Sequence, residues 1–329
     1  MGLRAELLGL GAFLVLAAAA PALPAWLVSL ATIAFANALV VLGLVILWRS
    51  GLIPFGQALF YCIGAYAVAL IGRYTPVRDV FVVVIVGGTV AGVVAWLTGY
   101  LLARYREIYF SMLSLAVSMI LYGVLVKTES LGSTDGFHVE AGTFFGIRPQ
   151  GRALDLSLFW LVLGFCAVGS ALVLAFFRSV AGALAVPARD NEIRLEYLGI
   201  SVDRLVHLEL VISGILAGVG GALAALAVGH VDPNMAYWTT SGGFVFVTIL
   251  AGPGSVAAAF IGSFVFELAR SIAVDLFPNT WQLTLGAALL LTILFLPDGL
   301  GSIRLPLRRP PKAAAAGEGD DAVASRRPS

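Results

Sequence analysis

Long segments without a single charged residue dominate this sequence. The first, 7–48, contains 42 residues without Asp, Glu, Lys or Arg, and a Pro-Ala-Leu-Pro turn at 21–24 divides it. A helix that crosses a membrane needs about 20 apolar residues, so this segment predicts two membrane spans. Only 12% of all residues are charged, about half the share of a soluble protein. This composition excludes a soluble enzyme, a nucleic-acid-binding protein and a disordered scaffold.

The remaining apolar segments, six of them free of charged residues, predict eight further spans, so we expect an all-α, polytopic membrane protein with about ten transmembrane helices. The eight lie at about 50–72, 80–103, 108–126, 156–177, 205–229, 238–251, 255–274 and 281–296. Glu209 lies near the start of the 205–229 span. The transmembrane domain would comprise 1–305, and a disordered cytoplasmic tail would follow over 306–329. The first segment also has features of a secretory signal peptide, with Arg4 before an apolar run. Cleavage is therefore a second interpretation of this segment.

The distribution of Lys and Arg predicts the orientation of the spans. With the N-terminus in the cytoplasm, fourteen Lys and Arg residues fall on the cytoplasmic side and five on the outer side, with Arg270 inside a span. Cytoplasmic loops of membrane proteins carry an excess of these residues. We therefore expect both termini in the cytoplasm, the 127–155 loop outside and the 178–204 loop inside.

The inner loop, 178–204, is the most informative polar segment. We expect a short helix from about 191 to 198, with Asp190 capping its N-terminus and Gly199 at its end. Its apolar side would carry Ile193, Tyr197 and Leu198, with Arg194 and Glu196 exposed. Two interpretations remain open from the residues alone. The loop is either a connector that satisfies its own helix ends or a docking element for another protein.

A few polar side chains lie inside predicted spans. Glu267 and Arg270 have the i,i+3 spacing of a helical ion pair, and unpaired charges would be costly there. We favour a structural pair over a pair that lines a pathway. Asn37 and Gln57 are candidate pathway residues, although each could instead form a hydrogen bond between helices. The segment 51–57, with two glycines and a proline, indicates a broken or re-entrant helix.

The chain lacks the motif for binding ATP. A Walker A motif requires Gly-Lys followed by Ser or Thr, and the only lysines, Lys127 and Lys312, do not follow glycine. If transport is driven by ATP, the ATPase is another polypeptide. The three histidines, His138, His207 and His230, have no metal-like spacing, so we assign no metal ligand.

Several motifs occur in a characteristic order. Segment 182–192 reads Gly-Ala-Leu-Ala-Val-Pro-Ala-Arg-Asp-Asn-Glu, and Gly-Ile follows at 199–200. Other motifs are Gly64-Ala65-Tyr66, Tyr109-Phe110, Asp135-Gly136, Gly252-Pro253-Gly254 and Pro297-Asp298-Gly299. On these residues, the chain resembles the LivM-type permease subunit of bacterial branched-chain amino-acid ABC importers over about 37–303. It departs from the usual family pattern at Leu52, Pro54, Gln57 and Ala183.

The resemblance implies a permease similar to those of type II ABC importers, in the bacterial inner membrane. Its partners would be a LivH-like second permease, two P-loop ATPase subunits and an extracytoplasmic solute-binding protein. The chain would be a transport subunit and not an enzyme. It would bind no cofactor, because ATP and Mg²⁺ would lie on the ATPase. The resemblance assigns coupling to the ATPase to Gly182, Arg189, Asp190, Asn191, Glu192, Tyr197, Leu198 and Gly199.

Other kinds of membrane protein remain as alternatives. An ion-coupled secondary transporter of small organic solutes is the main one, since such proteins use carboxylates or broken helices near the midplane. A channel and a membrane enzyme are weaker alternatives. The substrate would be a branched-chain or other hydrophobic amino acid, an amide, urea or a small aromatic carboxylate.

Overall fold

The computed structural model describes residues 19–140, 142–252, 256–276, 278 and 280–295. Nearly all of the first predicted span and the whole predicted tail lie outside these residues. The long helices are α2 (Ala25–Arg49), α3 (Gln57–Tyr74), α4 (Val80–Leu102), α5 (Glu107–Lys127), α6 (Arg152–Arg178), α9 (Val202–Val228), α10 (Trp238–Ala251), α11 (Val256–Leu276) and α12 (Trp281–Phe295). The short elements are η1 (Ala20–Ala22), η2 (Glu129–Leu131), η3 (Pro233–Ala236), β1 (Phe137–His138), β2 (His230–Val231), α7 (Val180–Asp190) and α8 (Glu192–Tyr197).

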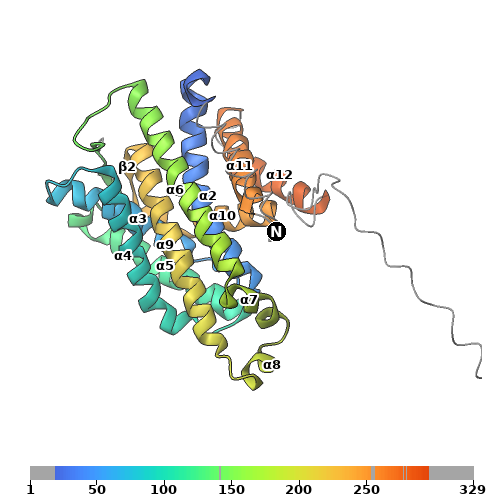
Figure 1. Ribbon diagram of the computed structural model, residues 1–329. Coiled ribbons are helices and arrows are strands. Elements are labelled where there is room, and N and C mark those ends of the chain that lie inside the picture. Colours follow the sequence, from blue (N-terminus) through green and yellow to red (C-terminus); the bar gives the residue numbers. More distant parts are fainter. Residues whose placement is uncertain (1–18, 141, 253–255, 277, 279, 296–329) are drawn as a thin grey trace, which may run out of the picture.

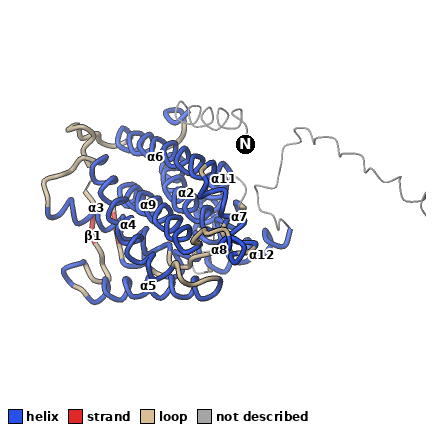
Figure 2. The backbone as a smooth tube through the Cα atoms, turned by 60° about the horizontal axis from the view of Figure 1, so that its bottom comes forward, coloured by secondary structure: helices blue, strands red, loops and turns tan. Residues whose placement is uncertain are grey.

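Helices α2 and α9 form the centre of the bundle (Figures 1 and 2). α9 packs against α2, α3 and α4, and α2 also packs against α6 and α11. The sequence of α2 is apolar around its whole circumference, as expected for a helix enclosed by others. α5, in contrast, buries few of its residues within this chain. The apolar side chains of α5 are therefore available to lipid or to a partner.

Small residues set the close spacing of α3 and α9. A Cβ atom at Gly64 would overlap the carbonyl oxygen of Gly218, and one at Gly221 would overlap the carbonyl oxygen of Tyr61. Interfaces between membrane helices commonly use small residues in this way, because packing and backbone approach replace the hydrophobic effect.

Within the described part of the chain, six helices are long and apolar enough to cross a membrane: α2, α4, α5, α6, α9 and α11. Helices α3, α10 and α12 are shorter, and they coincide with the third, eighth and tenth predicted spans. The predicted start of the third span, at residue 50, was wrong, because the helix begins only at Gln57. Residues 50–56 form turns and extended backbone, with Gly51 at a φ of 79° and Pro54 following. The predicted interruption of the helix therefore lies between α2 and α3.

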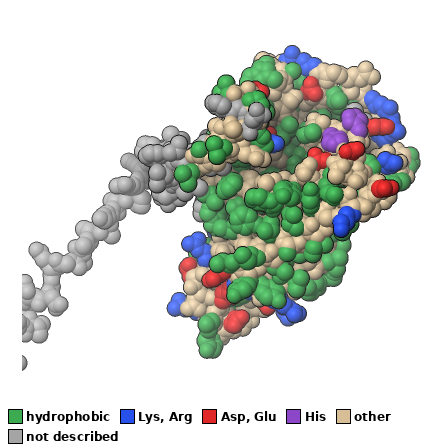
Figure 3. Space-filling model, turned by 180° about the vertical axis from the view of Figure 1, so that it is seen from behind, with side chains coloured by type: hydrophobic (Ala, Val, Ile, Leu, Met, Phe, Trp, Pro, Cys, Tyr) green, Lys and Arg blue, Asp and Glu red, His purple; other side chains and the backbone are tan. Residues whose placement is uncertain are grey.

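The two longest connections lie at opposite ends of the bundle, because α6 joins one to the other (Figure 1). At one end, β1 pairs with β2 in an antiparallel ribbon with His138 opposite His230. At the other end, α7 and α8 form a helical loop. Seen from behind, hydrophobic side chains form a broad band across the molecule, and charged side chains gather towards its two ends (Figure 3). This distribution is the one that a lipid bilayer requires.

Candidate functional site

The loop between α6 and α9 contains two capped helices where the sequence predicted one. Ser179 caps α7, its Oγ accepting a hydrogen bond from Gly182 N at 3.2 Å. Asn191 caps α8, its Oδ1 accepting from Arg194 N at 3.0 Å. The predicted cap, Asp190, was wrong, because Asp190 is the last residue of α7 and Asn191 has the extended backbone of an N-cap.

Gly199 ends α8 in the conformation that the sequence predicted. Its φ is 79°, a left-handed conformation that glycine adopts without a steric penalty. Gly199 N donates to Glu196 O at 2.9 Å, and Ile200 N donates to Leu195 O at 3.1 Å. This is the hydrogen-bond pattern of a Schellman motif. Leu195 is buried in a small core with residues of α5 and α9, so α8 is held against the bundle by this side chain.

The apolar side chains predicted for α8 face away from the bundle. Ile193, Tyr197 and Leu198 are exposed by 64%, 88% and 71%. Leu195, which the sequence did not single out, is the buried one. Arg189, Asp190, Arg194 and Glu196 are also exposed around them. Clustered apolar side chains on a protein surface are typical of a site that contacts another protein or a membrane. We call Ile193, Tyr197 and Leu198 the docking surface.

Arg106, in the turn between α4 and α5, fixes the position of α8. Its Nε lies 2.6 Å from Glu192 Oε1, and its Nη2 lies 2.8 Å from Asp203 Oδ1 in α9. Its Nη1 donates to the carbonyl oxygens of Ala103 and Tyr105. Glu192, a predicted coupling residue, thus forms an ion pair within the chain. No local sequence pattern indicated a role for Arg106, because its carboxylate partners lie 86 and 97 residues away.

The end of α7 contacts the interrupted segment between α2 and α3. A Cβ at Gly51 would lie 2.9 Å from Arg189 Cγ, so the arginine side chain covers this glycine. Gly182, another predicted coupling residue, is buried where α7 turns back on the end of α6. Ser50, the residue before Gly51, donates a hydrogen bond from its Oγ to Glu209 Oε1 at 2.7 Å. The coupling loop and the interrupted segment are therefore in direct contact.

Two polar side chains from α9 lie in the bundle next to this segment. Glu209 is fully buried, and its Oε2 has no hydrogen-bond partner among the described residues. One turn later, Ser213 accepts hydrogen bonds from Gln57 Nε2 at its Oγ (2.8 Å) and its carbonyl oxygen (3.2 Å). Gln57, a predicted pathway residue, therefore joins α3 to α9. Glu209 was noticed in the sequence only as a charge near the start of a span.

The structure keeps the other predicted residues apart from this cluster. Asn37 lies on α2, and its buried Oδ1 has no hydrogen-bond partner in the described part of the chain. Glu267 and Arg270 lie on α11, with Arg270 Nη1 3.4 Å from Glu267 Oε1. The guanidinium of Arg270 also lies 5.6 Å from the ring centre of Trp281. No group of three His, Cys, Asp or Glu side chains within the described residues has metal-binding geometry.

Several helices of membrane-spanning length define a polytopic membrane protein, and the loop between α6 and α9 exposes apolar side chains at one end of it. The chain belongs to the family described as the branched-chain amino acid transport system permease component, whose sequence profile matches residues 26–294. It is a permease subunit of the LivM type. No solved structure matches the chain.

Curated relatives agree with this assignment. The chain is 28% identical, over 308 aligned residues, to the LivM permease protein of the high-affinity branched-chain amino acid transport system of Escherichia coli K12, with 86% of this chain and 71% of the relative covered. It is 24% identical to the LivH permease protein of the same strain, with 76% and 85% covered. It is also 24% identical to a probable LivH permease protein of Methanocaldococcus jannaschii, with 73% and 78% covered.

Proposed function

We propose that this permease works in an ATP-binding cassette importer and, with a LivH-like second permease, forms the pathway for branched-chain or other hydrophobic amino acids or related small solutes. A separate pair of P-loop ATPase subunits would bind ATP and Mg²⁺, and this chain would bind no cofactor. The single observation that carries the proposal is the docking surface, because apolar side chains are exposed on a capped helix outside the spans. An ion-coupled secondary transporter has no need of such a surface.

The proposed topology has ten transmembrane helices in a type II importer-like arrangement, with both termini on the cytoplasmic side of the bacterial inner membrane. Over residues 19–295, apart from the short undescribed gaps, nine helices coincide with predicted spans. The 127–155 and 178–204 loops lie at opposite ends of the bundle (Figure 1). The bias of Lys and Arg supports the assignment of the α7–α8 end to the cytoplasm. An extracytoplasmic solute-binding protein would deliver substrate at the other end.

We assign two kinds of role within the coupling loop. Tyr197 and Leu198 would insert into the ATPase, with Asp190 and the exposed part of Arg189 at the rim of the contact. Asn191, Glu192 and Gly199 would position α8, because they form its N-cap, its ion pair and its end. Gly182 would position α7, because it is buried in the first turn of α7 against the end of α6. Asn37 and Gln57 remain candidate pathway residues, and Glu267 and Arg270 a structural pair.

The docking proposal is tested with Tyr197→Ala in the reconstituted complex. Co-purification of the ATPase and transport-linked ATP hydrolysis should both fall, while the permease inserts at normal levels. Tyr74→Ala is the matched control, since Tyr74 is 66% exposed at the opposite end of the bundle. If Tyr197→Ala and Tyr74→Ala behave alike in both measurements, α7–α8 is an ordinary connector.

A further inference from the structure

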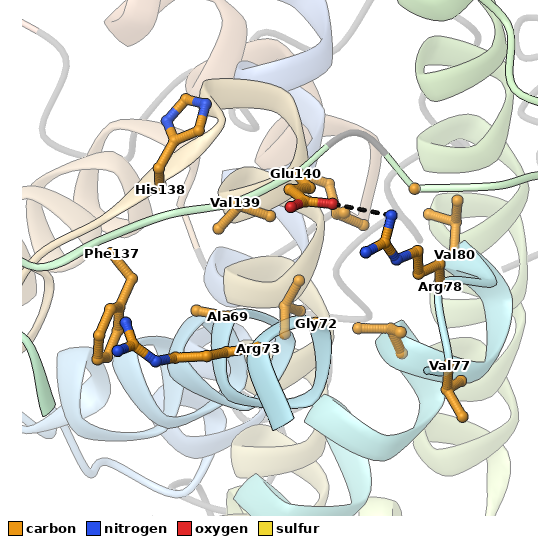
Figure 4. A pocket seen from close by; sticks show the side chains of 14 residues that line it. Ala69, Gly72, Arg73, Val77, Arg78, Val80, Phe137, His138, Val139 and Glu140 are labelled. Atoms are coloured by element: carbon orange, nitrogen blue, oxygen red, sulfur yellow. Dashed lines mark ion pairs between the residues drawn. The ribbon is translucent and has the colours of Figure 1, made fainter. Parts of the chain in front are cut away.

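A cavity of about 270 Å³ opens at the end of the bundle opposite α7 and α8 (Figure 4). It is bordered by the last turns of α3, the first turns of α4, residues 137–140 and Gly142. Its apolar surface includes Val68, Val80 and Leu226. Pockets for drug-sized ligands start at about 300 Å³, so this cavity has the size for a small solute.

Both signs of charge meet at the cavity. Arg78 Nη1 lies 3.0 Å from Glu140 Oε2, and the Glu140 side chain is 68% exposed. Across the cavity, the guanidinium of Arg73 lies 5.1 Å from the ring centre of Phe137. Arg73 forms no ion pair with any described residue. Figure 4 shows the imidazole of His138 turned away from both arginines. The cavity therefore offers one guanidinium without a carboxylate and one carboxylate with an oxygen to spare.

Two sets of backbone hydrogen bonds hold the walls of the cavity in place. Thr143 N donates to Arg78 O at 2.7 Å, and Val80 N donates to Thr143 O at 3.0 Å, which ties the 142–143 segment to the start of α4. The β1–β2 ribbon ties Phe137 to the chain after α9. These hydrogen bonds hold the backbone around the charged residues in one conformation before a ligand binds, which lowers the entropic cost of binding.

We infer that this cavity binds an aliphatic amino acid as its zwitterion. The carboxylate would pair with Arg73, the ammonium group with Glu140, and the aliphatic side chain would cover Val68, Val80 and Leu226. Each part of the ligand meets its complement, whereas a simple anion would be repelled by Glu140 and a simple cation by the two arginines. The identity of the ligand rests on the proposed function, and the site would hold substrate on the outer side of the permease.

The test measures binding of radiolabelled leucine to the complete transporter in nanodiscs without the solute-binding protein. Saturable binding is expected in the unaltered protein. Arg73→Gln should weaken it by about tenfold, the effect of losing one charge-assisted contact. Arg148→Gln is the matched control, since Arg148 is an exposed arginine in the 127–155 loop at the same end of the bundle but does not border the cavity.

Two further measurements separate this site from others. Glu140→Gln should weaken the binding of leucine. It should strengthen the binding of 4-methylpentanoate, which has the same carbon chain without the ammonium group and is repelled by the Glu140 carboxylate. Gly72→Leu should abolish binding of both, because a side chain at this helical glycine of the cavity wall meets no atom within 4 Å and would enter the open space. Gly164→Leu, at a helical glycine in α6 that also has no neighbour within 4 Å, is its control.

The outcomes decide the inference in either direction. Absence of saturable binding, or binding that the cavity variants and their controls affect equally, would overturn it. Displacement of leucine by phosphatidylethanolamine would overturn it in favour of a lipid headgroup. If Gly72→Leu fails to assemble, the Arg73 and Glu140 variants decide alone. If the complex imports leucine but the cavity variants do not alter leucine binding, this inference is wrong and the proposed function still holds. If the complex imports no aliphatic amino acid, the proposed function itself is contradicted.

Discussion

Replacing Arg106 with methionine should loosen α8 without unfolding the bundle. Methionine keeps much of the apolar volume but removes the contacts to Glu192 and Asp203 and to two carbonyl oxygens. An exposed ion pair contributes about 0.2–1 kcal/mol. The Arg106 side chain is only 22% exposed, so its pair with Glu192 should lie at the upper end of this range. Together the contacts should contribute about 1–2 kcal/mol to the local stability of α8.

Hydrogen exchange measures this local stability directly. The amide of Ile200 donates to Leu195 O at the end of α8 and is released when the helix opens. A loss of about 1–2 kcal/mol should speed its exchange by about 5–30-fold. Amides in the centre of α9 should be unaffected. Arg104→Met is the matched control, since Arg104 is exposed in the same turn and forms no ion pair with a described residue. Equal exchange rates at Ile200 in the two variants would refute the reasoning.

The same geometry changes how a charge reversal at Glu192 must be interpreted. Lysine at this position would face Arg106 and repel it, so Glu192→Lys should disorder α8 and reduce coupling even without any contact to an ATPase. Tyr197→Ala has no such internal effect, because its side chain is 88% exposed. Loss of ATPase binding with unchanged exchange at Ile200 is therefore expected for Tyr197→Ala alone.

Three further predictions concern the interior. Ser50→Ala should lower the free energy of unfolding by about 1–3 kcal/mol by removing the hydrogen bond to buried Glu209, and Glu209→Gln in the same chain should restore part of it; a thermal unfolding series with no recovery would contradict this. Glu267→Gln should reduce abundance by leaving Arg270 without its carboxylate, and neutralising both should recover much of the loss; normal abundance with lost transport would indicate a pathway role. Gly221→Val should destabilise the bundle by about 3 kcal/mol through overlap with α3, and unchanged thermal stability would show that the helices can separate.

The positions of the long helices could be predicted because charge is excluded from them. A charged side chain in a lipid-facing or buried span is costly, so gaps between charges locate α4, α5 and α6 within a few residues. The start of α3 was predicted less accurately in this way, because residues 50–56 contain no charged residue although they are not helical. Their departure from helical structure depends on Gly51 and Pro54, which indicate an interruption but not its length.

The coupling loop shows where local sequence rules reach their limit. Asp190 and Asn191 are equally good N-cap residues, and only the preceding helix decides between them, because α7 extends through Asp190. α7 itself was missed, since Pro187 in its interior is typical of a helix end. The tie between Arg106 and Glu192 joins residues that are distant in the chain, and no pattern within a single loop carries that information.

A continuous set of contacts connects the docking surface with the buried polar side chains of the bundle. A displacement of α8 must move α7 with it, because a single residue, Asn191, separates the two helices. The side chain of Arg189, in the last turn of α7, covers Gly51, and the adjacent Ser50 is bonded to Glu209 in α9. Residues 50–56 lack helical hydrogen bonds along most of their length, so they can change shape at lower cost than the helices on either side. A displacement of Tyr197 should therefore first change the backbone conformation between α2 and α3. This segment lies next to the hydrogen bonds that Gln57 makes with α9.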